Sequence, residues 1–380
     1  MRKLRMGMIG GGIGSFIGDV HRKAATLDGM IELVCGAFSS TAEKSKASGK
    51  DLLLPEDRCY GSFEEMILKE KALPENLRMD FVAIVTPNYM HFAPAKLALE
   101  NGFHVVCDKP MTLTEDEAKE LEELVKSTGL LFALTHNYPG SPMVKQAKAM
   151  VKNGDLGAIR KVQVHYLQGW MATAVEDSDN KQAAWRVDPS KSGLGGALGD
   201  IGTHAHNLVE YITGLKVKEL AADLGRFGKG RVLDDDGNIL LRLENGAKGI
   251  MSISQIAAGE ENNLSIRVYG EKGSLEWHQE KPNELITRWL DQPKMIFTSN
   301  GNDLYPLSLA ASRIPAGHPE GYLEAFANVY KNFATHLNAF KTKTPIETPD
   351  YPTVSVGVRG VQFIHAAVES DQQNAAWVGL

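Results

Sequence analysis

Short, continuous apolar runs recur along the first 135 residues of the chain. They span residues 4–9, 30–38, 80–86, 103–107 and 130–135. Runs that are apolar at consecutive positions are typical of strands buried on both faces of a parallel sheet. We therefore predict five parallel strands in this part of the chain.

Segments with helical periodicity lie between these runs. The clearest begins with Thr114 and Glu117, which have the spacing of a capping box, and it stops at Gly129. Strands that alternate with helices indicate βαβ units with right-handed crossovers. The sequence thus predicts an α/β fold whose N-terminal domain, residues 1–136, holds a doubly wound parallel sheet.

The pattern changes to period two after residue 137. Alternating runs occupy residues 161–167, 238–243, 248–255, 264–269 and 273–277. Successive runs of this kind favour a mainly antiparallel sheet. We predict a C-terminal α+β domain, residues 137–380, with an open sheet and with roles in substrate binding and oligomerisation.

Helical patterns at 197–213, 322–341 and 353–369 would cover one face of this sheet. The strand around 250–253 carries apolar residues on both faces, so the other face also needs cover. We therefore expect a homodimer or homotetramer. Two long stretches, 169–196 and 282–321, show no clear periodicity, and we expect the first to form a lid over a site.

Composition excludes several classes of protein. Lysine and arginine total 41 and aspartate and glutamate 47, with no basic cluster, so we expect no nucleic-acid partner. No window has the roughly 18 apolar residues of a spanning helix, so we expect no membrane partner. Cys35, Cys59 and Cys107 lack metal or redox spacing. They are expected to be buried free thiols in a cytoplasmic protein.

A glycine-rich turn follows the first predicted strand directly. It contains Gly10, Gly12, Ile13 and Gly14, where backbone N–H groups and a helix N-terminus would approach a pyrophosphate. The third glycine of the G-x-G-x-x-G pattern is replaced by Ser15. We therefore predict that residues 1–136 form a Rossmann domain that binds a dinucleotide, with a plain tight turn as the alternative.

The end of the second predicted strand bears on which dinucleotide binds. An acidic residue there normally holds the ribose 2′-hydroxyl of NAD, but this chain has Ser39 and Ser40, followed one turn later by Lys44. Hydroxyls and a nearby cation tolerate a 2′-phosphate, so the cofactor is NADP or NAD, with NADP favoured. Alternatively, the serines are helix caps and the lysine is merely solvated.

Three ordered motifs resemble the Gfo/Idh/MocA oxidoreductases, the family of glucose-fructose oxidoreductase and inositol dehydrogenase. They are AIVTPNYMH at 83–91, HVVCDKP at 104–110 and GGALGDIGTHAHNLVEYITG at 195–214. The E-K-P of the family stands here as Asp108-Lys109-Pro110, a conservative departure, while its G-G-x-x-x-D-x-G-x-H is intact. The similarity covers essentially the whole chain.

The resemblance implies hydride transfer between a nicotinamide and a carbinol carbon of a sugar, glycoside or cyclic polyol. His204 would be the general base and Lys109 would stabilise the developing alkoxide. Asp200 would hold a neighbouring hydroxyl and orient the base. In some relatives the lysine is discussed as the base. Asp200 and His204 also share one helix face by spacing. We expect no metal, since His206 points off that face.

Further site residues follow from the same resemblance. On the cofactor side they are Thr86, Pro87, Asn88, His91, Asp108, Lys109, Asn137, Trp185 and Arg186. On the substrate side, Trp170 of the expected lid, His318 and Tyr322 join Lys109, Asp200 and His204. The alternative for His318 and Tyr322 is that they are packing groups. Two alternative functions stay open: an NAD-dependent glycosidase of the same fold, and a non-catalytic dinucleotide-binding sensor.

Overall fold

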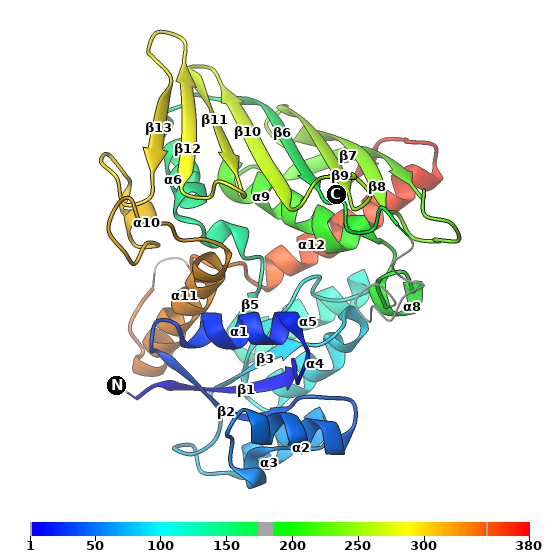
Figure 1. Ribbon diagram of the computed structural model, residues 1–380, viewed down its shortest axis with the longest axis vertical. Coiled ribbons are helices and arrows are strands. Elements are labelled where there is room, and N and C mark those ends of the chain that lie inside the picture. The colour runs from blue at the N-terminus through cyan, green and yellow to red at the C-terminus, as the bar shows by residue number, and fades with distance from the viewer. Residues whose placement is uncertain (1, 174–184, 347–348) are drawn as a thin grey trace. The chain divides into compact units, whose positions relative to one another are not determined.

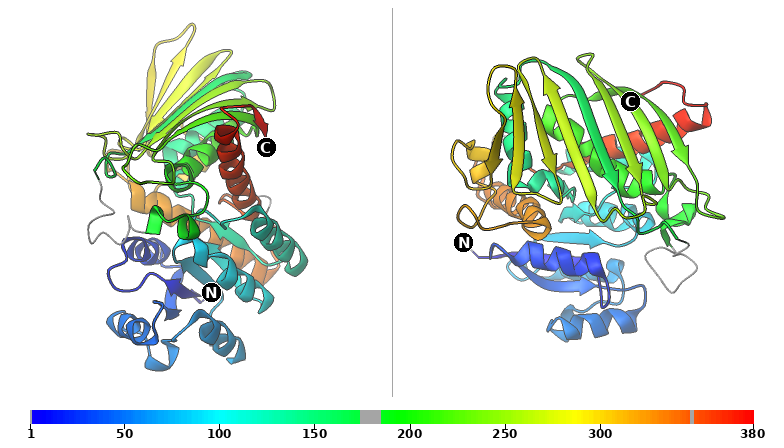
Figure 2. Two further views of the ribbon diagram at one scale, coloured as in Figure 1. Left: turned by 90° about the vertical axis from the view of Figure 1, so that its right-hand side faces the viewer. Right: turned by 45° about the horizontal axis from the view of Figure 1, so that its top comes forward.

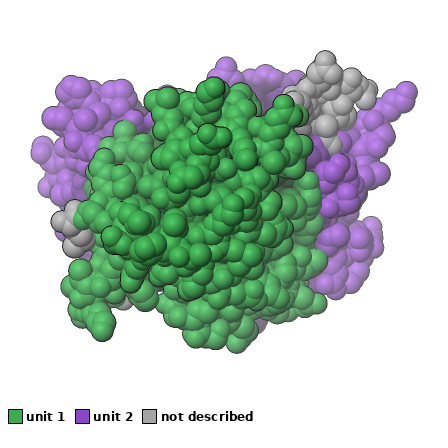
Figure 3. Space-filling model, turned by 90° about the horizontal axis from the view of Figure 1, so that it is seen from below, with its two compact units in different colours: residues 1–136, 326–358 green, residues 137–325, 359–380 purple. Residues whose placement is uncertain are grey.

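The computed structural model describes residues 2–173, 185–346 and 349–380, and the chain divides into two compact units. The first comprises residues 1–136 and 326–358, and the second 137–325 and 359–380, as coloured in Figure 3. The predicted domains had left 326–358 with the second part. These residues belong to the first unit because Phe333, on helix α11 (Tyr322–Thr342), packs edge-on against Phe81, with ring centroids 5.1 Å apart.

The first unit is built on a five-stranded parallel sheet in the order β2-β1-β3-β4-β5 (Figure 1). Its strands are β1 (Leu4–Gly10), β2 (Ile31–Ala37), β3 (Phe81–Val85), β4 (His104–Cys107) and β5 (Phe132–Leu134). Its helices are α1 (Phe16–Thr26), α2 (Ala42–Asp51), α3 (Phe63–Ala72), α4 (Phe92–Glu100) and α5 (Glu115–Thr128), with short 3-10 turns at Glu56–Arg58 and Asn88–Met90. The predicted Rossmann fold and its five strands are confirmed.

Local sequence signals account for these helix boundaries. The Thr114 hydroxyl accepts the N–H of Glu117, whose carboxylate reaches back to the Thr114 N–H, so the predicted capping box is present. The same helix ends at Gly129, whose φ of 66° is the left-handed conformation that glycine adopts at little cost. Cys35, Cys59 and Cys107 are all free and buried, as expected.

The second unit contains a nine-stranded sheet in the order β13-β12-β11-β10-β6-β9-β8-β7-β14. β6 and β9 are parallel, and every other pair of neighbours is antiparallel. The strands are β6 (Ile159–Leu167), β7 (Val217–Gly225), β8 (Asp236–Leu243), β9 (Lys248–Ser254), β10 (Asn263–Gly270), β11 (Gly273–His278), β12 (Glu284–Trp289), β13 (Met295–Thr298) and β14 (Val378–Gly379). The predicted open, mainly antiparallel sheet is confirmed.

Helices lie against one face of this sheet (Figure 2). They include α6 (Pro142–Lys152), α9 (Thr203–Thr213) and α12 (Val354–Gln372). The unit also contains the short helices α8 (Pro189–Ser192) and α10 (Pro306–Leu309) and a 3-10 turn at Tyr138–Gly140. Their buried core includes Leu208 of α9 and Met251 and Ile253 of β9, whereas Ile250, which precedes Met251, is 43% exposed on the other face. β9 therefore carries apolar residues on both faces, as the sequence predicted.

Two features of the second unit correct the sequence analysis. The stretch 282–321, which showed no periodicity, holds β12, β13 and α10. The helix predicted over 197–213 includes a π-helical turn, Leu198–Gly202, before it continues as α9. Residues 174–184, at the centre of the expected lid, lie outside the described residues. In the part of the chain that is described, no helix is long and apolar enough to span a membrane.

Candidate functional site

The glycine turn after β1 is shaped for close approach of a ligand to the backbone. Gly10, Gly11 and Gly14 have φ angles of 79°, 71° and 78°, which side chains rarely tolerate. A Cβ on Gly12 would lie 2.7 Å from Ser48 Oγ and 2.8 Å from the Phe38 carbonyl oxygen. A Cβ would be crowded at Gly10, Gly11 and Gly12, so this part of the turn needs glycine. Such a turn is the cradle that a dinucleotide pyrophosphate requires.

Gly18 takes the role of the glycine that the motif lacked at position 15. It lies in the first turn of α1, and a Cβ there would overlap the backbone of Gly11. Ser15 instead caps the helix, because its hydroxyl accepts the Gly18 N–H at 3.2 Å. The close contact between turn and helix is therefore kept with a different glycine spacing.

Ser39, Ser40 and Lys44 follow β2. Ser39 is partly exposed, and Ser40 and Lys44 are exposed. The N-cap position of α2 is Thr41, so neither serine is the helix cap that the alternative interpretation assumed. The hydroxyls and the ammonium group thus remain candidates for contacts with the cofactor ribose.

The loop after β3 is tied to the end of β4. Thr86 donates to the Met90 carbonyl at 2.9 Å. His91 is fully buried, with Nδ1 2.7 Å from the Pro110 carbonyl and Nε2 2.9 Å from the Thr86 carbonyl. The ring of His91 therefore joins two loops. Pro87 starts the turn and Asn88 is 7% exposed.

Asp108 fixes the backbone that carries Lys109. Its Oδ1 accepts the Lys109 N–H and the Thr135 hydroxyl, both at 2.8 Å. Behind it lies His21, fully buried, with Nε2 3.9 Å from Asp108 Oδ2 and Nδ1 2.7 Å from the Tyr330 hydroxyl. Burial lowers the pKa of His21 to about 4. Sequence reasoning missed His21 because no local motif marks it.

In the second unit, Asp200 lies in the π-helix and His204 in the first turn of α9. Asp200 Oδ2 accepts from Arg186 Nε at 3.2 Å and from Gln255 Nε2 at 2.9 Å. The structure therefore pairs Arg186 with Asp200, while the Trp185 ring lies 4.4 Å from the Arg186 guanidinium. The side chain of Asp200 keeps 20% of its surface exposed.

His204 lies among aromatic rings. Its ring centroid is 5.0 Å from that of Tyr138 and 6.4 Å from that of Tyr166, and Tyr322 lies 6.4 Å from Tyr138. The Tyr138 and Tyr166 hydroxyls are 2.5 Å apart, and burial raises the pKa of both. His204 itself is 8% exposed. Tyr322 therefore adjoins the histidine through Tyr138.

Three amide side chains at the ends of neighbouring strands form a hydrogen-bonded row that begins at Asp200, and we call them the amide row. Gln255 follows β9, Gln168 follows β6 and Asn262 precedes β10. Gln168 accepts from Gln255 at 3.4 Å and donates to Asn262 at 2.8 Å, and Trp170 Nε1 donates to Gln168 at 3.1 Å. Asn262 in turn accepts the Tyr166 hydroxyl at 2.8 Å. Sequence reasoning found Asp200 and Trp170 but none of the three amide residues.

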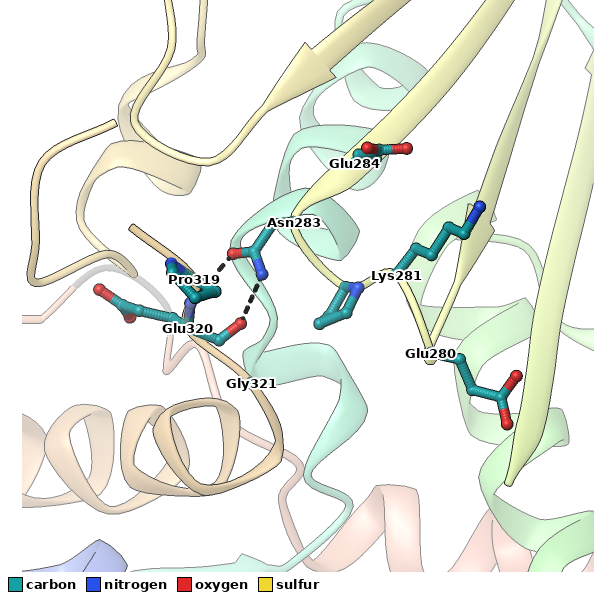
Figure 4. A pocket seen from close by; sticks show the side chains of 8 residues that line it. Glu280, Lys281, Asn283, Glu284, Pro319, Glu320 and Gly321 are labelled. Carbon is teal, nitrogen blue, oxygen red and sulfur yellow. Dashed lines mark hydrogen bonds between the residues drawn. The ribbon is translucent and has the colours of Figure 1, made fainter. Parts of the chain in front are cut away.

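Other predicted residues lie outside this network. His318 is exposed, with Nδ1 3.2 Å from the Pro315 carbonyl. An open cavity of about 480 Å³ lies beside it, lined by residues 280–284 and 319–321. There the Asn283 amide binds both backbone groups of Glu320 (Figure 4). Asn137 is buried, and its carbonyl accepts the Gly140 N–H at 2.8 Å.

His206 packs against the interior of the second unit. Its Nε2 lies 3.4 Å from Glu210, and its ring stacks on Phe363 with centroids 4.5 Å apart. Among the described residues, no group of three or more histidine, cysteine, aspartate and glutamate side chains is arranged to hold a metal ion.

Comparison with known proteins places these features in a family. Residues 4–136 match the oxidoreductase family model with an NAD-binding Rossmann fold, and residues 144–276 match the GFO/IDH/MocA C-terminal domain. An uncharacterised oxidoreductase of Bacillus subtilis is 35% identical over 99% of this chain and 97% of its own. Levoglucosan dehydrogenase of Pseudarthrobacter phenanthrenivorans is 29% identical over 75% of this chain and 76% of its own.

Solved structures agree over the full length. An inositol dehydrogenase homologue from Azotobacter vinelandii, complexed with NAD+, has a TM-score of 0.96 at 35% identity over 100% of this chain and 98% of that one. Its complex with NADH and myo-inositol has a TM-score of 0.94 at 34% identity, with the same coverage. The chain therefore belongs to the Gfo/Idh/MocA family of NAD-binding oxidoreductases.

Proposed function

We propose that the protein is an NAD(P)-dependent dehydrogenase that oxidises a carbinol carbon of a sugar, glycoside or cyclic polyol. The observation that carries the proposal is the continuous set of hydrogen-bonding groups from Asp200 through the amide row to the tyrosines beside His204. Carboxylate, amide and phenol groups in sequence suit a ligand with several neighbouring hydroxyls.

The family supports the same class of substrate. The Azotobacter homologue was solved with myo-inositol, and levoglucosan dehydrogenase with NADH and levoglucosan at 26% identity and a TM-score of 0.84 over 100% of this chain and 99% of that one. Both ligands are uncharged rings with hydroxyl groups. We therefore extend this class of ligand to the present chain.

Each proposed residue has one task. When bound, the nicotinamide accepts the hydride that leaves the carbinol carbon. His204 takes the hydroxyl proton, the role that an imidazole most often has in general acid–base catalysis. Lys109 donates a hydrogen bond to the same oxygen and stabilises its developing negative charge. Asp200 and the amide row hold neighbouring hydroxyls, which orients the ring.

The decisive experiment is a screen for reduction of NAD+ and NADP+ at 340 nm against myo-inositol, levoglucosan, glucose and simple glycosides. We expect at least one ring polyol or sugar to reduce one cofactor at a saturable rate. Glycoside cleavage without net NADH would point to the glycosidase alternative. Cofactor binding with no turnover on any member of the panel would favour the sensor.

A further inference from the structure

One residue satisfies three successive N–H groups at the start of the helical segment that carries Asp200 and His204. The Asp234 carboxylate accepts the Gly196 N–H through Oδ1 and the Leu198 N–H through Oδ2, each at 2.6 Å. The Asp234 carbonyl accepts the intervening Ala197 N–H at 2.9 Å. The first N–H groups of a helix have no partner within the helix, so Asp234 supplies three partners at once.

Asp234 is itself held in a rigid loop between β7 and β8. The adjacent Asp235 accepts the N–H groups of Phe227 and Gly228 at 3.0 and 2.7 Å, and Arg231 Nη1 at 3.0 Å. The side chains of Asp235 and Arg231 are 1% and 3% exposed. Buried, charge-assisted bonds of this kind fix a loop geometry closely, so the loop presents Asp234 in one position.

The same loop also contacts Gln255, one of the two side chains that donate to Asp200. The Asp235 carbonyl accepts the Gln255 N–H at 2.9 Å, and the Gln255 side chain donates to Asp200 at 2.9 Å. Asp234 thus holds the start of the helical segment that carries Asp200, and the adjacent Asp235 holds Gln255, which donates to Asp200.

The contact between Asp234 and the start of the helical segment restricts which residue can stand at position 196. A Cβ on Gly196 would overlap the Asp234 carbonyl group. The backbones approach so closely only because position 196 lacks a side chain. The second glycine of the G-G-x-x-x-D-x-G-x-H motif therefore serves the contact with Asp234.

We propose that Asp234 is a positioning residue that fixes the rotation and depth of the helical segment bearing Asp200 and His204. This inference rests on the proposed function, since it assigns Asp234 an effect on the turnover that His204 supports. Asp234 does not act on substrate itself. It acts through the first turn of the helix.

The test uses Asp234→Asn in the full-length protein, with a substrate found in the screen. The amide retains the size of the carboxylate but has one acceptor oxygen, so its NH2 group faces one of the two N–H donors. Misplacement by a fraction of an ångström should lower kcat about 10- to 100-fold. Cofactor affinity, measured by calorimetry, should stay within about twofold.

A double-mutant cycle separates positioning from a general loss of stability. If Asp234 acts through His204, Asp234→Asn added to His204→Gln should lower kcat by less than about threefold further, because the coupled residue is already gone. Asp236→Asn makes the same chemical change two residues further on, at the first residue of β8, and should leave kcat unchanged. If Asp234→Asn does not fold, Asp234→Ser, which keeps one acceptor oxygen, replaces it in the same measurements.

Two results would overturn the inference. One is wild-type kcat in a folded Asp234→Asn protein, and the other is a loss that adds in full to that of His204→Gln. The proposed function fails separately, when His204→Gln alone leaves turnover unchanged.

Discussion

Gly18 in helix α1 lies against Gly11 in the turn after β1, so closely that a Cβ on Gly18 would overlap the Gly11 backbone. Gly18→Ala should therefore push the turn away from the helix and distort the pyrophosphate cradle. We expect cofactor affinity to fall by at least about tenfold, or 1.4 kcal/mol. Calorimetric titration with NAD+ measures this.

A matched control is Gly29→Ala, in the turn after the same helix. Gly29 has a φ of 69° and nothing within 4 Å of an added Cβ, so the change strains only its own backbone. This variant should lose stability but keep its NAD+ affinity. Equal losses of affinity in both variants would contradict a specific role for Gly18.

The parts of the fold that sequence patterns predict best are those buried on both faces. β3 has five consecutive buried residues, so its apolar run is unmistakable. β12 and β13 escaped notice because they lie toward one edge of the sheet, and β13 has no buried residue. An exposed edge strand needs no apolar alternation, so its pattern carries little signal.

The residues of the candidate site also fall into two groups, those that a local motif identifies and those that only the fold brings together. Lys109, Asp200 and His204 lie in short motifs that can be read along the chain. The sheet brings Gln255 to Asp200, and Asp234 to the start of the helical segment at Gly196, from distant positions in the sequence. A glutamine at a strand end has no distinctive spacing. Long-range contacts of this kind can be found only once the register of β6, β9 and β10 is known.

Lys109→Ala tests the proposed stabilisation of the alkoxide. The change removes an ammonium group but leaves Asp108, whose bond to the Lys109 backbone N–H does not depend on the side chain. Turnover should fall by roughly 10²- to 10³-fold, the scale of losing one stabilising donor. NAD+ affinity should change much less. Steady-state rates and calorimetry decide between this result and near wild-type turnover, which would remove Lys109 from the catalytic set.

Ser39→Asp should change the choice of cofactor. The wild-type end of β2 offers the hydroxyls of Ser39 and Ser40 and the exposed Lys44, so we expect NADP+ to bind at least as well as NAD+. A new carboxylate would accept from the ribose 2′-hydroxyl of NAD+ and repel a 2′-phosphate. NADP+ affinity should drop by about tenfold or more, with NAD+ retained. An unchanged ratio of the two dissociation constants would place the ribose elsewhere.

The exposed sheet face predicts self-association. Leu240 on β8 and Ile250 on β9 are directly paired neighbours, 49% and 43% exposed on the face opposite the helices. Leu240→Lys with Ile250→Lys should weaken a homodimer or homotetramer formed through this face. Light scattering should then move toward the 41.5 kDa of one chain. Leu68→Lys, at an exposed position on α3, is the control and should leave the mass unchanged.

Asp234 should also make stability depend on pH in a defined window. Burial raises its pKa from the ordinary 3.8 to about 6, against the opposing effects of the Leu198 and Gly196 N–H groups. Because the folded protein holds this proton more tightly than the unfolded chain, the free energy of unfolding falls as pH rises from about 4 to 6, by about 2 to 3 kcal/mol.

Asn at position 234 cannot titrate, so the difference in the free energy of unfolding between wild type and Asp234→Asn should shrink by that amount across the window. All five tryptophans lie in residues 170–377, so urea unfolding followed by tryptophan fluorescence reports on the part of the chain that contains Asp234. Parallel pH curves for the two proteins would show that the pKa of Asp234 does not differ between the folded and the unfolded states.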